Sequence, residues 1–157
     1  MGNEYHYGVE SEPSLSTMEI SGAYLEDVHR HFEGTLTIDN TTGQFVGTMT
    51  DPYGMADFIG EKIGNTMCFI KLYRNRNPHG YPITYDYRKT DNNEWQGLYR
   101  YGLIDDDTGE TTCNMYQLLQ SPIAVEDFQR TCREVGGIVT QRREEIAAIF
   151  GKTRRVE

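Results

Sequence analysis

The sequence predicts a mainly β protein, an eight-stranded antiparallel up-and-down β-barrel with a C-terminal helical segment. Apolar and polar residues alternate with a period of two along most of residues 18–120, as they do in half-buried strands. Short turn sequences rich in Gly, Asp and Asn separate these stretches, and none of the connections is long enough for a crossover helix. Beyond Leu119 the apolar residues recur instead at helical spacing.

The 157 residues are enough for one domain with a sizeable core, and they divide into four parts. Residues 1–17 contain Gly, Pro, Ser and acidic residues without periodicity, which indicates a flexible N-terminal arm. We expect the β-barrel to span 18–120 and amphipathic helices to span 121–151. Residues 152–157 form a short basic tail.

The first strand candidates show the alternation most plainly. Residues 18–24 carry Met, Ile, Gly and Tyr at every second position, so that these share one face. In the stretch 31–39 the apolar side chains face one way, and the His, Glu, Thr and Asp side chains face the other. A turn at 39–43 leads to a third alternating stretch at 45–50, and a second turn follows at Asp51–Gly54.

The remaining strand candidates have similar lengths and spacing. They lie at about 55–63, 66–74, 81–89, 94–104 and 110–119. Glycines recur inside the strands, at Gly22, Gly34, Gly47, Gly60 and Gly97. Interior glycine weakens a flat strand but permits sharp coiling, and eight antiparallel strands are a natural number for closure into a barrel. These features favour an up-and-down barrel over a sandwich.

After Leu119 the pattern becomes helical. Ser121 and Pro122 suit the N-cap and first position of a helix. Apolar residues then follow at three-, four- and seven-residue intervals: Phe128, Cys132, Val135, Val139, Ile146 and Ile149. We expect Gly136–Gly137 to divide this segment into helices near 124–135 and 138–150. The apolar stripe is buried either against the barrel wall or in a partner subunit, and both alternatives stay open.

Charge and composition exclude several classes of function. The net charge is −9, and residues 1–121 alone carry −10, which disfavours nucleic-acid binding. No apolar run approaches the roughly 20 residues that cross a bilayer, and the N-terminus lacks the apolar core of a signal peptide. We therefore expect a soluble cytoplasmic protein that does not bind membranes. The three cysteines, with no Cys-x-x-Cys pair, indicate reduced thiols.

Aromatic residues concentrate on one face of the later strands. The stretch "EWQGLYRYG" at 94–102 holds the only tryptophan and two tyrosines on the same stagger. The residues that we expect to line a ligand pocket are Trp95, Tyr99, Tyr101, Tyr85, Tyr73, Lys71 and Asp57. Pockets for small apolar or aromatic molecules have such aromatic walls with a few polar groups.

One lysine shares a face with aromatic residues. Lys71 shares a strand face with Phe69 and Tyr73, and Asp57 on the preceding strand is a candidate partner across the sheet. A charge pair inside a barrel is a functional candidate because burying charge without pairing is costly. Two alternatives stay open: Lys71 faces outward, or the pair is a structural ion bridge at the barrel mouth.

Metal and nucleophile patterns are weak. His29 and His31 would share one strand face, but the sequence offers no clear third or fourth ligand. The acidic run 105–107 lacks the ligand spacing of a calcium loop. No Gly-x-Ser-x-Gly sequence occurs, and no cysteine has a neighbouring histidine. We therefore predict neither a metal nor a cofactor.

The meander, together with the strand 43–49, the strand 69–73 and Trp95-Gln-Gly-Leu-Tyr99, resembles the calycin group. Within that group the pattern is most similar to the avidin and streptavidin barrels, and a helix after the eighth strand is similar to the lipocalins. The resemblance covers roughly 18–120 and implies a barrel that opens into a cavity at one end, with Trp95 as a pocket wall. Avidins use several tryptophans where this chain has one, so we do not expect biotin as the ligand.

These observations lead to three hypotheses of function. The first is a non-enzymatic calycin-like protein that binds a small apolar or aromatic molecule at the barrel mouth. The second is an interaction module with a filled barrel, which forms homo-oligomers through its C-terminal helices. The third is a barrel enzyme of the cyclase or isomerase kind, with Lys71, Asp57 or the tyrosines in acid–base roles.

Overall fold

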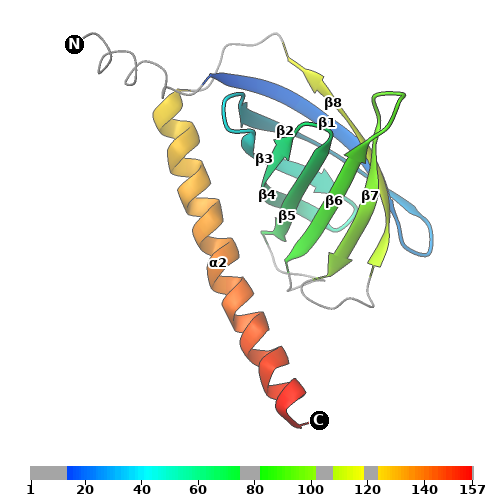
Figure 1. The fold of residues 1–157 in the computed structure, drawn as a ribbon, viewed down its shortest axis with the longest axis vertical. Coiled ribbons are helices and arrows are strands. Elements are labelled where there is room, and N and C mark those ends of the chain that lie inside the picture. Colours follow the sequence, from blue (N-terminus) through cyan, green and yellow to red (C-terminus); the bar gives the residue numbers. More distant parts are fainter. Residues whose placement is uncertain (1–13, 75–81, 102–107, 119–123, 157) are drawn as a thin grey trace.

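The structure, a computed structural model, describes residues 14–74, 82–101, 108–118 and 124–156. For Tyr101 and residues 143–156 it describes the backbone alone. Eight antiparallel strands, each hydrogen-bonded to its neighbours in sequence, close into a barrel in which the first strand also pairs with the last (Figure 1). The predicted fold class is confirmed.

The strands follow one another in the chain order of an up-and-down barrel. They are β1 (Leu15–Leu25), β2 (His29–Asp39), β3 (Gln44–Asp51), β4 (Gly54–Ile63), β5 (Thr66–Tyr73), β6 (Ile83–Lys89), β7 (Trp95–Tyr101) and β8 (Thr108–Gln117). The first strand begins at Leu15, inside the segment that we predicted to be an arm, because residues 15–17 continue the pairing with the end of β2. Residues 1–13 of the predicted arm lie outside the described residues.

Close approach between strands explains why glycine stands at two positions. A side chain on Gly97 of β7 would fall on the carbonyl oxygen of Asp86 in β6. A Cβ on Gly109 of β8 would lie 2.5 Å from the hydroxyl oxygen of Tyr99, whose ring crosses that glycine. Glycine at these positions therefore leaves room for the neighbouring strand at Gly97 and for the Tyr99 ring at Gly109.

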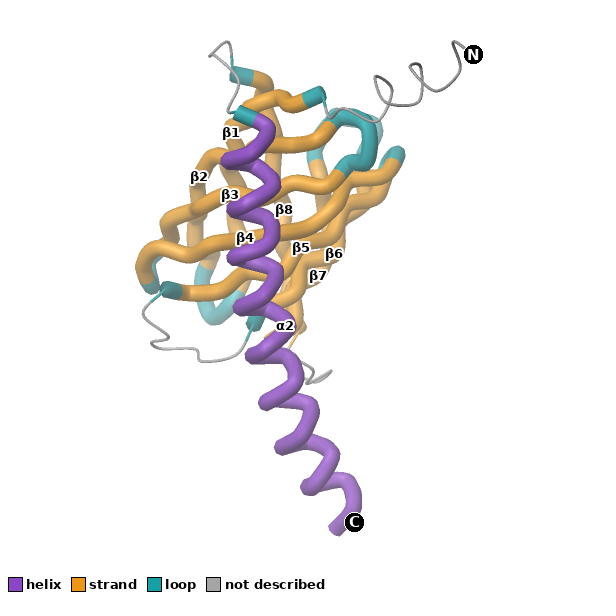
Figure 2. The backbone as a smooth tube through the Cα atoms, turned by 90° about the vertical axis from the view of Figure 1, so that its left-hand side faces the viewer, coloured by secondary structure: helices purple, strands orange, loops and turns teal. Residues whose placement is uncertain are grey.

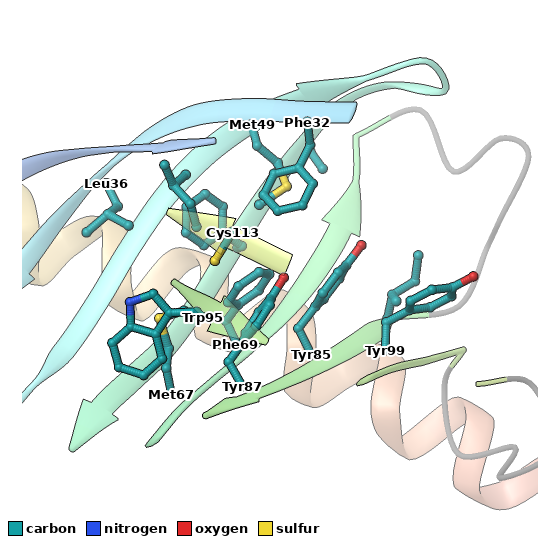
Figure 3. Close-up of a cluster of buried hydrophobic side chains, with 14 of the residues drawn as sticks. Phe32, Leu36, Met49, Met67, Phe69, Tyr85, Tyr87, Trp95, Tyr99 and Cys113 are labelled. Atoms are coloured by element: carbon teal, nitrogen blue, oxygen red, sulfur yellow. The ribbon is translucent and has the colours of Figure 1, made fainter. Parts of the chain in front are cut away.

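The inward faces of all eight strands meet in one packed core. Rings of Phe69 and Tyr85 stack with centroids 4.6 Å apart, and Phe45 contacts Phe58 and Phe69 edge-on at 6.0 and 6.2 Å. Figure 3 shows Trp95, Tyr87, Tyr85 and Phe69 pointing into this interior together with side chains from the opposite wall. Each of these residues is at most 4% exposed, so aromatic side chains fill the barrel along much of its length.

The C-terminal segment forms one helix, α2 (Val125–Val156), so the prediction of a break at Gly136–Gly137 was wrong. Each glycine costs the helix about 1 kcal/mol relative to alanine, but Val135 and Val139 on either side of the pair are buried and offset that cost.

The helix α2 packs on the outside of the barrel. Phe128 and Val135 form a second apolar cluster with Val46 of β3, and Ile59 of β4 packs against that cluster. Figures 1 and 2 show α2 running along the wall at β3 and β4, while its C-terminal part continues past the end of the barrel. The wall therefore buries the first part of the apolar stripe. Among the described residues, no helix is both long and apolar enough to cross a bilayer.

Candidate functional site

The first candidate site is a buried lysine in a cage of tyrosines. Lys71 of β5 points into the barrel and is fully buried. Its ammonium donates hydrogen bonds to the carboxylate of Asp51 and, at 3.3 Å, to the hydroxyl oxygen of Tyr85. The same nitrogen lies 4.7 Å from the ring centroid of Tyr73 and 5.0 Å from that of Tyr24. Cation–π attraction therefore supplements the ion pair.

The carboxylate of Asp51, at the end of β3, is saturated with donors. One oxygen accepts hydrogen bonds from the hydroxyls of Tyr24 and Tyr73 and from the Lys71 ammonium. The other oxygen accepts a hydrogen bond from the backbone N–H of Tyr53 at 2.8 Å. Since the side chains of both charged residues are completely buried, the barrel encloses an ion pair whose partners satisfy one another.

Burial sets the direction of each pKa in this cluster. Desolvation lowers the pKa of Lys71, and the charge of Asp51 opposes that change. Desolvation raises the pKa of Tyr24 and of Tyr73 well above the ordinary value, and the negative charge of Asp51 adds to both increases. Both phenols therefore stay protonated at neutral pH and serve as donors to the carboxylate.

A polar belt covers the cluster at the barrel end formed by the β1–β2 and β3–β4 turns. The hydroxyl of Tyr53 donates a 2.7 Å hydrogen bond to Glu26, and the guanidinium of Arg30 lies 3.3 Å from the same carboxylate oxygen. The Tyr53 ring meets the Tyr73 ring edge-on at 6.2 Å. The belt thus links the β1–β2 turn to the β3–β4 turn, next to the caged lysine.

The expected pairing of Lys71 with Asp57 was wrong. Asp57 lies on the outer face of the barrel, 2.8 Å from the guanidinium of Arg74. The register explains the difference, because Phe58 is the residue opposite Lys71 and Asp57 therefore points to the other side of the sheet. The true partner, Asp51, stands in a turn sequence, but it continues the inward alternation of Phe45, Gly47 and Met49. Extending that alternation by one step would have found it.

The predicted aromatic residues whose side chains the structure describes are core residues. Trp95 is 2% exposed, with the ammonium groups of Lys62 and Lys89 about 6 Å from its ring. Tyr99 donates a 2.6 Å hydrogen bond from its hydroxyl to the carbonyl of Leu25. Tyr85 and Tyr73 belong to the lysine cage. The side chain of Tyr101 lies outside the described residues.

The second candidate site is a groove outside the barrel. It has a volume of about 850 Å³ and lies between α2 and the outer wall formed by β4, β5 and β6. Ile59, Ile70 and Val139 supply apolar surface. The polar lining includes Glu61, Cys68, Thr84, Asp86, Arg100 and Thr140. Sequence reasoning missed this groove, because its residues come together only through strand register and the docking of α2.

The groove wall consists of two rows of residues that cross neighbouring strands. The register places Glu61 beside Cys68 and Cys68 beside Asp86, which makes one row across β4, β5 and β6. The adjacent row contains Ile59, Ile70 and Thr84. An acidic row and a mainly apolar row therefore run side by side beneath α2.

Glu61 and Asp86 are two of the three carboxylates among the described residues that line the groove, and Asp39 is the third. Within the described part of the chain, neither Glu61 nor Asp86 forms an ion pair or a side-chain hydrogen bond. Burial raises the pKa of the Cys68 thiol between them, and both carboxylates raise it further. A raised pKa means that less of this thiol is ionised at neutral pH.

Gly136 on α2 lines the groove without a packing requirement for glycine. A Cβ at this position would meet only the Cδ1 of Ile59, at an ordinary distance of 3.8 Å. The next residue, Gly137, has open space around it. Since glycine destabilises a helix interior, close packing does not account for Gly136, whereas the absence of a side chain does enlarge the groove.

Metal-binding geometry is absent from the described residues, where no three His, Cys, Asp or Glu side chains gather to hold an ion. His29 and His31 are both exposed on β2. The acidic run 105–107 lies outside the described residues.

Comparison with known proteins does not assign the chain to a family. The chain matches no protein-family model and no curated protein sequence.

Proposed function

We propose that this chain is a non-enzymatic binding protein that takes a small apolar or aromatic molecule in the groove between α2 and the outer barrel wall. The observation that carries the proposal is the contrast between the two sides of that wall. Inside, packed rings occupy the predicted pocket. Outside, a groove of about 850 Å³ combines an apolar surface with a few polar groups, as small-molecule sites do.

The proposal moves the ligand site from the barrel mouth to the outer wall. In this arrangement the barrel is a rigid scaffold, and the caged Lys71 is part of its internal structure rather than of a reactive site. The eight-stranded closed barrel followed by a helix supports the calycin resemblance, and kinship with that group is part of the same proposal.

The experiment is a titration of the full-length chain with Nile red, a neutral dye whose emission rises in apolar surroundings. We expect saturable binding that Gly136→Leu weakens at least tenfold, because the added side chain enters the groove beside Ile59. Gly137→Leu is the matched control, since it makes the same change one residue away, in open space. Equal binding by both variants, or none by the unaltered chain, would contradict the proposal.

A second candidate function is assembly through α2, with the filled barrel as a scaffold. The observation that favours it is the C-terminal part of α2, which continues past the end of the barrel in Figures 1 and 2. Ile138, on the described part of α2, is also 47% exposed. Native mass spectrometry tests this idea: a dimer is expected, which Ile138→Glu dissociates and the neighbouring Gln141→Glu does not. A monomer at every concentration would exclude it.

A further inference from the structure

We propose that the groove selects ligands that carry a primary ammonium group on an apolar body. The inference rests on the proposed function of the groove, and it names the chemical class that the site takes. It follows from where the acidic and apolar rows lie, from the lack of internal partners for the acids, and from the charge of the chain as a whole.

The acidic row offers two carboxylates to one cation. Glu61 and Asp86 flank Cys68 on either side, one strand apart from it in each direction. With strands about 4.8 Å apart, the two acidic residues stand about 10 Å from one another along the row. An ammonium placed over Cys68 has three donors and can direct them to both carboxylates.

The apolar row receives the remainder of the ligand. Ile59 and Ile70 lie directly beside the acidic row, and Val139 faces them from α2. Gly136 leaves room between the helix and Ile59. A ligand with its charged end over Cys68 can therefore bury an apolar body between the wall and the helix, where contact with these side chains favours binding.

The groove has a net negative charge that the described residues do not neutralise internally. Arg100 also lines it, at the Thr84 end of the apolar row, and among the described lining residues it is the one cation against Asp39, Glu61 and Asp86. Neither Arg100 nor the acids of the row form an ion pair within the described part of the chain. The net charge of −9 further attracts cations and repels anions. A carboxylate ligand is disfavoured at the same place.

Three probes with one alkyl chain isolate the effect of the charged group: octylammonium, octan-1-ol and octanoate. Each is titrated into the ¹⁵N-labelled full-length chain, and the backbone amide shifts of Cys68, Thr84 and Val139 report binding in the groove. We expect octylammonium to bind about tenfold more tightly than octan-1-ol at low salt, and octanoate to bind more weakly than both. The preference for octylammonium should decrease as salt is added.

Removing the acids tests the assignment. Glu61→Gln with Asp86→Asn should weaken octylammonium binding about tenfold and leave octan-1-ol binding unchanged. The control is Glu19→Gln with Glu110→Gln, which removes the same charge from exposed strand positions that do not line the groove. Binding within twofold of the unaltered chain is expected for this control. All four replaced residues are exposed, so each variant should keep the dispersed amide spectrum of the folded chain.

The outcomes separate the two proposals. If octan-1-ol and octanoate bind in the groove as tightly as octylammonium does, the groove binds apolar ligands without regard to charge, and the inference is overturned. The same conclusion follows if octylammonium binding survives the loss of Glu61 and Asp86, or if the control pair weakens it equally. If none of the three probes shifts the groove amides, the proposed function and the inference both fail.

Discussion

Replacing Lys71 with methionine removes the cation from the tyrosine cage and leaves the Asp51 carboxylate buried among neutral donors. The side chains of both residues are completely buried in the folded chain. Removing one partner of such a pair costs about 3–5 kcal/mol, because the remaining charge loses its counterion but stays out of water. The loss is a large fraction of the roughly 5–15 kcal/mol by which a domain of this kind is stable.

A double-mutant cycle measures how much of this loss belongs to the pair. Asp51→Asn keeps a carbonyl oxygen that can accept from Tyr24 and Tyr73, so Lys71→Met with Asp51→Asn removes both charges while retaining an acceptor. We expect the double variant to be at least about 2 kcal/mol more stable than the sum of the two single losses predicts. Urea unfolding at 25 °C, followed by far-ultraviolet circular dichroism, gives the four free energies of unfolding.

The matched control is an ion pair on the outer face of the barrel, between Asp57 of β4 and Arg74 just after β5. Arg74 and Asp57 are 2.8 Å apart, but their side chains are 50% and 24% exposed. The cycle of Arg74→Met and Asp57→Asn should give a coupling below about 1 kcal/mol, because water screens this pair. Equal coupling energies for the inner and outer pairs would refute the account of Lys71 as a caged, desolvated cation.

Three further predictions follow from the core and from α2. Because the pKa values of Tyr24 and Tyr73 are raised in the folded chain, these phenols ionise only on unfolding, so stability is intact below pH 10 and falls as the pH rises further. Urea titrations at pH 10.5 to 11.5 should show a loss of about 1.4 kcal/mol per pH unit for each tyrosine, and Tyr73→Phe should lessen the slope. Gly97→Ala should destabilise the barrel by about 2 kcal/mol or more, because the methyl group would strike the Asp86 carbonyl; an unchanged melting temperature would contradict this. Gly137→Ala should stabilise α2 by about 0.5–1 kcal/mol in the same assay, since the added methyl group contacts nothing; a lower stability would contradict the open surroundings of that glycine.

The barrel interior was predictable from local sequence to a large extent. The alternation around Phe32 and Leu36, and that around Phe45 and Met49, determines which side chains point inward once a strand forms. The tyrosine-rich later strands were likewise predicted to face inward, and Trp95 does so. Whether these aromatic residues line a ligand pocket or fill the core was not predictable, because both arrangements give the same alternation along the strand.

The partner of Lys71 shows the limit of that reasoning. The alternation along β3 places Asp51 inward. The sequence Asp51-Pro-Tyr-Gly54 also has the composition of a turn, however, and turn residues are ordinarily exposed. Which carboxylate meets the lysine depends on register between strands, and register is a long-range property. The continuous helix across Gly136–Gly137 also depends on long-range packing. Burial of Val135 and Val139 against the barrel outweighs the low helix propensity of the two glycines.

The sequence by itself determined the class of fold, the order of the strands and the side of each strand that faces the core, since these follow from a period of two and from short turns. Only the tertiary structure decided that the barrel is filled, that Lys71 pairs with Asp51, and that a groove lies beneath α2. The physical reason is that volume and charge pairing depend on which distant residues are brought together. Glu61, Asp86 and Gly136 become neighbours only after eight strands have closed and a helix has docked on their outer wall.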